Sequence, residues 1–86
     1  SKCWQHYTLA FNNLHPDFEK RLVNKHPSIT AAELKLSTLV RLGFSIKEIS
    51  ELMFHTPESI RVSRSRLRKK MELDMSQNLH SYLSGI

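Results

Sequence analysis

The amino-acid sequence predicts an all-α domain of about five helices. Its 86 residues include only two glycines, which leaves little material for the tight turns of an all-β fold. Apolar residues make up 40% of the chain and recur at helical spacing. Residues typical of helix starts precede several of these segments. The length allows one domain with a small hydrophobic core.

Residues 1–28 predict an N-terminal helical extension of two segments. In the first, large side chains recur at spacings of three, four and three residues, which places on one helical face Trp4, Tyr7, Phe11 and Leu14. We interpret this stripe as part of the core, because helical spacing is more typical of packing than of a platform for stacking on bases.

The second segment, "HPDFEKRLVNKH", also predicts a helix. Pro16 suits its first turn, and the acids Asp17 and Glu19 beside it favour a helix N-terminus. The apolar side of this helix is formed by Phe18, Leu22 and, as a further candidate, Val23. Pro27 ends the helix, because the residue before a proline avoids the helical conformation.

Residues 29–86 predict the main domain, which begins with a helix in "TAAELKLSTLVRLGF". Thr30 and Glu33 form a capping box at its start. A broad apolar face indicates that this helix is buried at the centre, through Leu34, Leu36, Leu39, Val40 and Leu42. Gly43 suits the left-handed position after the helix end.

Two further helices follow after short breaks. Ser45 and Glu48 form a second capping box in "SIKE", and Thr56 caps the next helix with Pro57 at its first position. The inner face of the helix after Ser45 is predicted to be Ile46, Ile49, Leu52 and Met53. Helices joined by such short breaks, one of them carrying Gly43, are the sequence pattern of a helix-turn-helix.

The stretch "SIRVSRSRLRKK" holds six of the thirteen Lys and Arg residues, between Arg61 and Lys70. On a helix, a narrow inner stripe is formed by Ile60, Leu67 and Met71, with Ser63 beside it. The opposite, outer arc carries Glu58, Arg61, Val62, Ser65 and Lys69, flanked by Arg66 and Arg68. The alternating "SRSRLR" would also fit a strand, but the Thr56-Pro57 start favours a helix.

After this helix, "DMSQNLHSYLSGI" predicts one more amphipathic helix that ends at Gly85. Its apolar side is predicted to be Met75, Leu79, Tyr82 and Leu83.

The charge distribution indicates an anionic partner. The net charge is +5, and the basic helix carries charges of nearly one sign, which phosphates would neutralise. Binding to a membrane surface would need bulky apolar residues free to insert, and this helix needs its apolar residues for the core. We therefore expect nucleic-acid binding.

The segment from Thr30 to Leu73, "TAAELKLSTLVRLGFSIKEISELMFHTPESIRVSRSRLRKKMEL", resembles the LuxR/GerE-type helix-turn-helix of bacterial transcription regulators. With "HPDFEKRL" before it and "NLHSYL" after it, the chain resembles the C-terminal domain of large bacterial sensor-regulators of two-component type. The resemblance covers about Trp4 to Ile86. It implies a LuxR-like helix-turn-helix within the winged-helix-like superfamily, without a wing, and an upstream sensor that often lies across a membrane segment.

The resemblance also implies roles for individual residues. The helix from Glu58 to Leu73 would enter the major groove of duplex DNA, with its base-contacting positions at Arg61, Val62 and Ser65. Ser65 is shorter than the residue common there, and Ser63, where the family often has histidine, is assigned to packing. Contacts to the DNA backbone are expected from Ser59, Arg64, Arg66, Arg68 and Lys69. Lys47, at the start of the preceding helix, is a further phosphate candidate, and a solvated lysine is an equal alternative there.

The expected function is sequence-specific DNA binding for transcriptional regulation, as a cytoplasmic output domain that dimerises on paired half-sites. The dimer contact could come from the C-terminal helix or from the aromatic N-terminal helix. One alternative is a sigma-factor-like module that contacts RNA polymerase. Another is a protein-interaction module whose basic helix meets an acidic partner.

The sequence gives little support for an enzyme, a cofactor or a metal site. Its acids are few and unpaired, and no glycine-rich phosphate loop or paired nucleophile and base is recognisable. Cys3 and His6 lack a second pair at metal-ligand spacing, and the single cysteine excludes an internal disulfide. We expect no membrane span or signal peptide in these residues.

Glu33 is a candidate ion-pair partner for an arginine such as Arg64 across the edge of the core.

Overall fold

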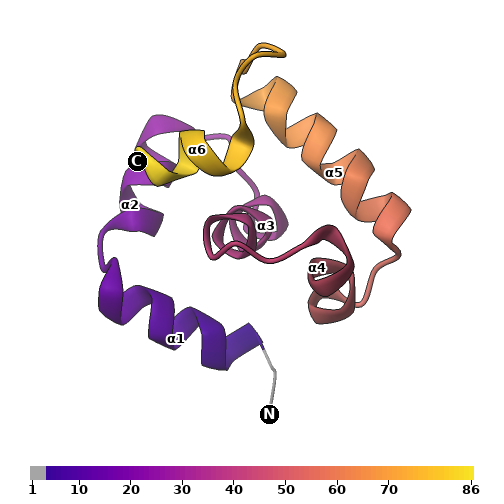
Figure 1. Cartoon of the computed structure of the whole chain (residues 1–86). Helices are drawn as coiled ribbons and strands as arrows, with labels where there is room; N and C mark the ends of the chain where they lie inside the picture. The colour runs from indigo at the N-terminus through magenta and orange to yellow at the C-terminus, as the bar shows by residue number, and fades with distance from the viewer. Residues whose placement is uncertain (1–3) are drawn as a thin grey trace.

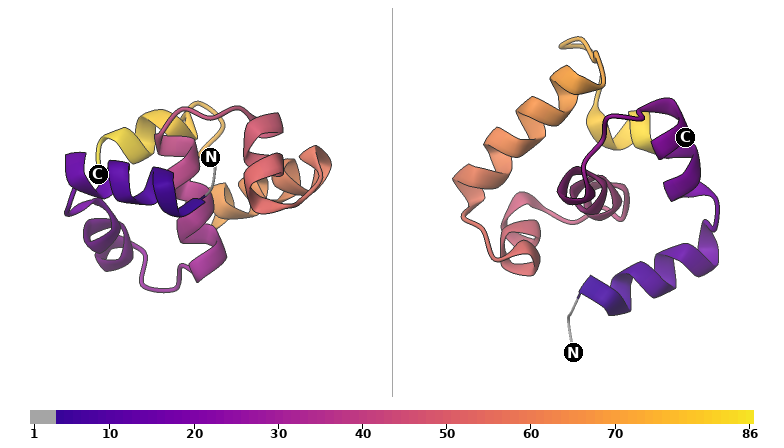
Figure 2. Two further views of the ribbon diagram at one scale, coloured as in Figure 1. Left: turned by 90° about the horizontal axis from the view of Figure 1, so that it is seen from below. Right: turned by 180° about the vertical axis from the view of Figure 1, so that it is seen from behind.

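The computed structural model describes residues 4–86, and this part of the chain is all-helical, as the sequence predicts. Its helices are α1 (Trp4–Leu14), α2 (Phe18–Lys25), α3 (Ala31–Arg41), α4 (Ile46–Met53), α5 (Pro57–Lys70) and α6 (Leu79–Ser84). Figure 1 looks along the axis of α3, which lies at the centre with the other helices around it. The two further views agree that α5 and α2 lie on opposite sides of α3 (Figure 2).

Every helix contributes to one hydrophobic core. The buried side chains are Phe11, Phe18, Leu22, Leu36, Leu39, Val40, Ile49, Ile60, Leu67, Met71, Leu79 and Leu83. The central position of α3 follows from its broad apolar face, because Leu36, Leu39 and Val40 are buried together. The core is continuous across residue 28, so the N-terminal extension and the main domain share it.

Both predicted capping boxes are present. The Thr30 hydroxyl accepts a hydrogen bond from the Glu33 backbone N–H at 3.1 Å, and the Glu33 carboxylate accepts one from the Thr30 N–H at 2.8 Å. Ser45 and Glu48 repeat the arrangement at the same distances. Each box satisfies N–H groups that a helix start leaves without a partner inside the helix.

Left-handed residues end three helices. Gly43 has a φ of 89°, and the N–H groups of Gly43 and Phe44 donate to the carbonyls of Val40 and Leu39, which is a Schellman motif. The left-handed conformation predicted for Gly43 is confirmed. The same motif ends α4 at Phe54 (φ 57°) and α5 at Glu72 (φ 58°), where no glycine signals it.

Two apolar residues of α1 and α2 that were predicted to pack are exposed. Leu14, on α1, is 76% exposed, whereas Phe11 of the same stripe is buried and Tyr7 packs its ring edge-to-face on Phe44 at 4.8 Å. The Trp4 side chain lies outside the described part of the chain. Val23, the further candidate of α2, is 39% exposed. Pro16 precedes α2 in a turn instead of lying in its first helical turn.

Met75 is fully exposed, and the prediction that it belongs to the last helix is wrong. Asp74 holds this segment in a turn, because its carboxylate accepts hydrogen bonds from the Ser76 N–H and hydroxyl. The helix α6 starts only after Asn78, whose side chain caps it by accepting from the Ser81 N–H at 3.0 Å. The predicted packing of Leu79 and Leu83 is confirmed, since both are buried.

Polar contacts to Tyr82 hold α6 against α2. Its hydroxyl oxygen lies 2.6 Å from His26 Nε2, and Lys25 Nζ lies 5.3 Å from the centre of the Tyr82 ring. Burial lowers the pKa of His26, the Lys25 charge lowers it further, and Glu72 opposes part of that shift.

Within residues 4–86, no helix is both long and apolar enough to cross a lipid bilayer.

We predict that Gly43→Ala lowers the free energy of unfolding by about 1 kcal/mol, because an alanine resists the left-handed conformation. Open space surrounds the added Cβ, so the cost is that of the backbone alone. Gly85→Ala is the matched control, since its φ is −87° and its Cβ would meet only ordinary contacts. Urea unfolding of the three proteins measures the effect, and equal losses in both variants would contradict this account.

We predict that part of the stability of the fold is lost as the pH falls below about 6.5, the ordinary pKa of histidine. The folded state disfavours protonated His26, so the unfolded state binds more protons in this range and gains relative to the folded state. Urea unfolding at pH 7.5 and 5.5 should therefore show a smaller pH effect in His26→Gln than in the wild type. His80→Gln, which replaces an exposed histidine of α6, should keep the wild-type pH effect.

Candidate nucleic-acid interface

The candidate site is the outer face of α5, and local sequence features explain where this helix begins. The Thr56 hydroxyl accepts a hydrogen bond from the Ser59 N–H at 3.1 Å, and Pro57 occupies the first helical position. Buried Ile60, Leu67 and Met71 dock the helix on the core. Only the three residues from Phe54 to Thr56 separate α5 from α4, and these two helices pack on each other. The structure thus joins α4 and α5 by a short turn and packs them on each other.

The outer face carries a shallow groove of about 250 Å³. We call it the α5 groove, and its lining residues are Glu58, Arg61, Val62, Ser65, Arg66 and Lys69. All six are exposed. The structure therefore brings together the three predicted base-contacting residues Arg61, Val62 and Ser65. Two of the predicted backbone-contacting cations, Arg66 and Lys69, lie beside them.

The charges of the α5 groove are mostly free to meet a ligand. Arg66 and Lys69 make no ion pair or hydrogen bond with another side chain of residues 4–86. Arg61 lies 3.9 Å from the Glu58 carboxylate, and both side chains are more than half exposed. Exposed ion pairs of this kind contribute little to stability. A ligand can therefore displace this contact at low cost.

The other predicted backbone-contacting residues lie outside the α5 groove. Ser59 and Arg64 are half-buried, and Lys47 is exposed in the first turn of α4. Burial lowers the pKa of Arg64, and the neighbouring Arg68 charge lowers it further, although an arginine stays charged. Arg68 is half-buried and donates a hydrogen bond of 2.7 Å to the Asp74 carbonyl. Arg68 thus serves the fold at the end of α5, which sequence reasoning missed.

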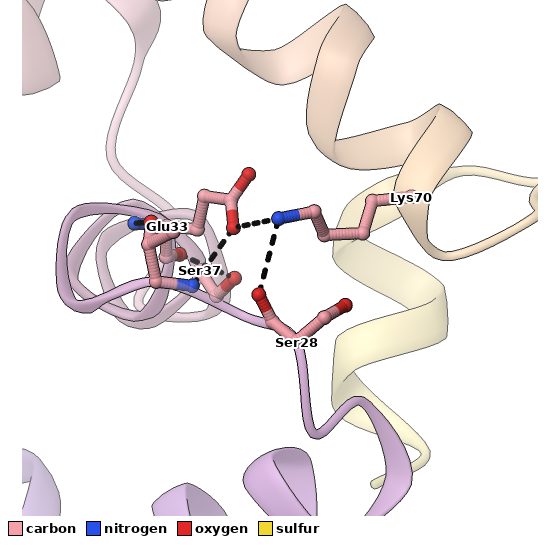
Figure 3. Close-up of polar contacts among 5 residues, drawn as sticks. Ser28, Glu33, Ser37 and Lys70 are labelled. Atoms are coloured by element: carbon pink, nitrogen blue, oxygen red, sulfur yellow. Dashed lines mark hydrogen bonds and ion pairs between the residues drawn. The ribbon is translucent and has the colours of Figure 1, made fainter.

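Lys70 points away from the groove, towards α3. Its Nζ donates hydrogen bonds to the Glu33 carboxylate at 2.8 Å and to the Ser28 carbonyl at 3.2 Å (Figure 3). The suggested pairing of Glu33 with Arg64 is therefore wrong, because Lys70 reaches Glu33 from the end of α5. Burial alone would raise the pKa of Glu33, but hydrogen bonds from Lys70 and Thr30 and the Lys70 charge outweigh burial and lower it.

Among the described residues, no three His, Cys, Asp or Glu side chains are close enough to hold a metal ion. Cys3, the sulfur ligand considered from the sequence, lies outside residues 4–86. Comparisons with known protein families, with curated protein sequences and with solved structures find no match to this chain.

We predict that Lys70→Met lowers the free energy of unfolding by about 1–2 kcal/mol near neutral pH, because it removes a partly buried, charge-assisted contact between α5 and α3. The pKa of Glu33 is lowered in the folded state, so this contribution is complete above about pH 5 and is lost as the pH falls through that lowered pKa. Urea unfolding at several pH values measures it. The matched control is Lys69→Met, which changes an exposed side chain and should leave stability nearly unchanged.

Proposed function

We propose that this domain binds duplex DNA in a sequence-specific manner, with α5 in the major groove, and serves as the output domain of a transcriptional regulator. The observation that carries the proposal is the α5 groove, where the three predicted base-contacting residues and two free cations are exposed together on one helix face. The major groove of B-DNA admits an α-helix, and the 14 residues of α5 are long enough to span it.

The proposed contacts divide into two kinds. Arg61 suits bidentate hydrogen bonds to guanine, Val62 suits a thymine methyl group, and Ser65 can reach a polar base edge. Arg66, Lys69 and, from α4, Lys47 would bind phosphates and set the register without reading sequence. The position of α5 supports access by a duplex, because the helix lies at the edge of the molecule, away from α2 (Figure 2).

The resemblance to LuxR/GerE-type domains supports the same function. On that basis we propose a cytoplasmic domain that follows a sensor region and binds paired half-sites as a homodimer. The apolar side chains Leu79 and Leu83 of α6 are buried within this chain, whereas Leu9 and Leu14 of α1 are exposed. The exposed side chains favour α1 over α6 as the dimer contact.

The first experiment is selection of bound duplexes from a randomised DNA pool at about 0.15 M salt. Recovery of a motif, above all a repeated or inverted one, supports a sequence-specific regulator and gives the half-site spacing. Binding without any motif reduces the proposal to non-specific DNA binding. Loss of all DNA binding favours a partner protein with an acidic surface. Tight binding to RNA polymerase with weak binding to free DNA favours the sigma-factor-like alternative.

We predict that Arg61→Ala relaxes the preference at one base pair and weakens binding to the selected site by about 1–3 kcal/mol. Lys69→Ala should weaken binding to selected and random duplexes alike and reduce the salt dependence. Lys69 is a cleaner control than Arg68, because Arg68 also holds the Asp74 carbonyl. Fluorescence anisotropy with both duplexes at several salt concentrations measures these effects. Equal losses on both duplexes for Arg61→Ala would remove it from the base-contacting set.

A further inference from the structure

One acid lies among the cations of the α5 groove. Glu58 lines the groove together with Arg61, Arg66 and Lys69, and its side chain is 76% exposed. Its one charged contact among the described residues is the loose 3.9 Å approach to Arg61. A carboxylate on a face that meets phosphates weakens non-specific binding to DNA. If the α5 groove only coated DNA, an acid at this position would be a disadvantage.

Helix capping does not explain this acid. In α3 and α4 the first-turn acids Glu33 and Glu48 stand at the third helical position, where each closes a capping box. In α5 that position is taken by Ser59, whose N–H donates to Thr56. Glu58 stands at the second position, and its carboxylate receives no hydrogen bond from the helix start within residues 4–86. The negative charge of Glu58 still interacts favourably with the helix dipole, but that interaction does not require the side chain to lie in the α5 groove.

The chemistry of base edges gives this carboxylate a ligand. In the major groove cytosine offers an amino group that donates hydrogen bonds, whereas guanine offers two acceptors, which a carboxylate repels. Arg61 has the complementary preference, for guanine. Three residues along a helix advance about 4.5 Å, close to the separation of about 3.4 Å between neighbouring base pairs. Glu58 and Arg61 can therefore reach adjacent base pairs from one turn of α5.

We infer that Glu58 determines specificity by accepting a hydrogen bond from the amino group of a cytosine, next to the base pair that Arg61 contacts. The inference rests on the proposed function, because it requires α5 in the major groove. Binding separates Glu58 from Arg61 as each side chain takes its own base. On duplexes without the right bases, the carboxylate stays among phosphates and lowers affinity, so the same residue favours the correct site and disfavours the others.

The test is selection from a randomised pool with the wild type, Glu58→Gln and Glu19→Gln. Glu19 is the matched control, because it is exposed and stands at the second position of α2, a helix that lies across α3 from α5 (Figure 1). In Glu58→Gln the preference for cytosine at one position should fall at least about fivefold and shift to adenine, which glutamine contacts through N6 and N7. Affinity for random duplexes should rise in Glu58→Gln, whereas Glu19→Gln should keep the wild-type preferences. Unchanged helical content by circular dichroism shows that both variants fold.

Two results would overturn the inference, and they are distinguishable. If the wild type recovers a motif and Glu58→Gln recovers the same motif with the same base frequencies, Glu58 is only a charge at a helix start and the proposed function stands. If the wild type recovers no motif at all, the proposed sequence-specific function fails, and the role of Glu58 fails with it.

Discussion

The arrangement of the domain depends on one constraint: α5 must stay packed on the core although six of its ten residues from Arg61 to Lys70 are cations. Like charges at helical neighbour positions repel one another, and the apolar stripe of Ile60, Leu67 and Met71 must outweigh that repulsion. The protein neutralises part of the charge itself. Lys70 turns inward to Glu33, and Arg68 donates to the Asp74 carbonyl. The cations that remain most exposed, Arg61, Arg66 and Lys69, are those of the groove.

The contact of Lys70 with Glu33 also links α5 to α3. Glu33 accepts hydrogen bonds from both the Thr30 N–H and Lys70 Nζ, so one carboxylate closes the start of α3 and fixes the end of α5 (Figure 3). The other end of α5 is fixed by Thr56 and by packing on α4. Because both ends are tied to neighbouring helices, the outer side chains of α5 stand on a well-held element, as the proposed contacts to bases would require.

Much of this was predictable because the signals are local. Capping boxes, the Thr56-Pro57 start and Gly43 each act within a few residues, and the inner and outer faces of α5 follow from helical periodicity alone. The failures have tertiary or turn-level causes. Met75 fits a helical stripe, but Asp74 and Asn78 hold a turn there instead. The partner of Glu33 depends on where the far end of α5 lies in space, which periodicity does not give. Phe54 and Glu72 adopt left-handed conformations that no glycine announces.

The position of an acid within a helix's first turn decides whether the acid serves the fold or remains available to a ligand. At the third position Glu33 and Glu48 reach back to the residue before the helix and close its start. At the second position Glu58 makes no such bond within the described residues and faces the α5 groove instead. An interface of cations alone would bind all duplexes through their phosphates, because every sequence presents the same backbone. In the proposed complex, the Glu58 carboxylate among those cations would lower general affinity and raise selectivity. It would do so without weakening α5, since a negative charge favours a helix N-terminus.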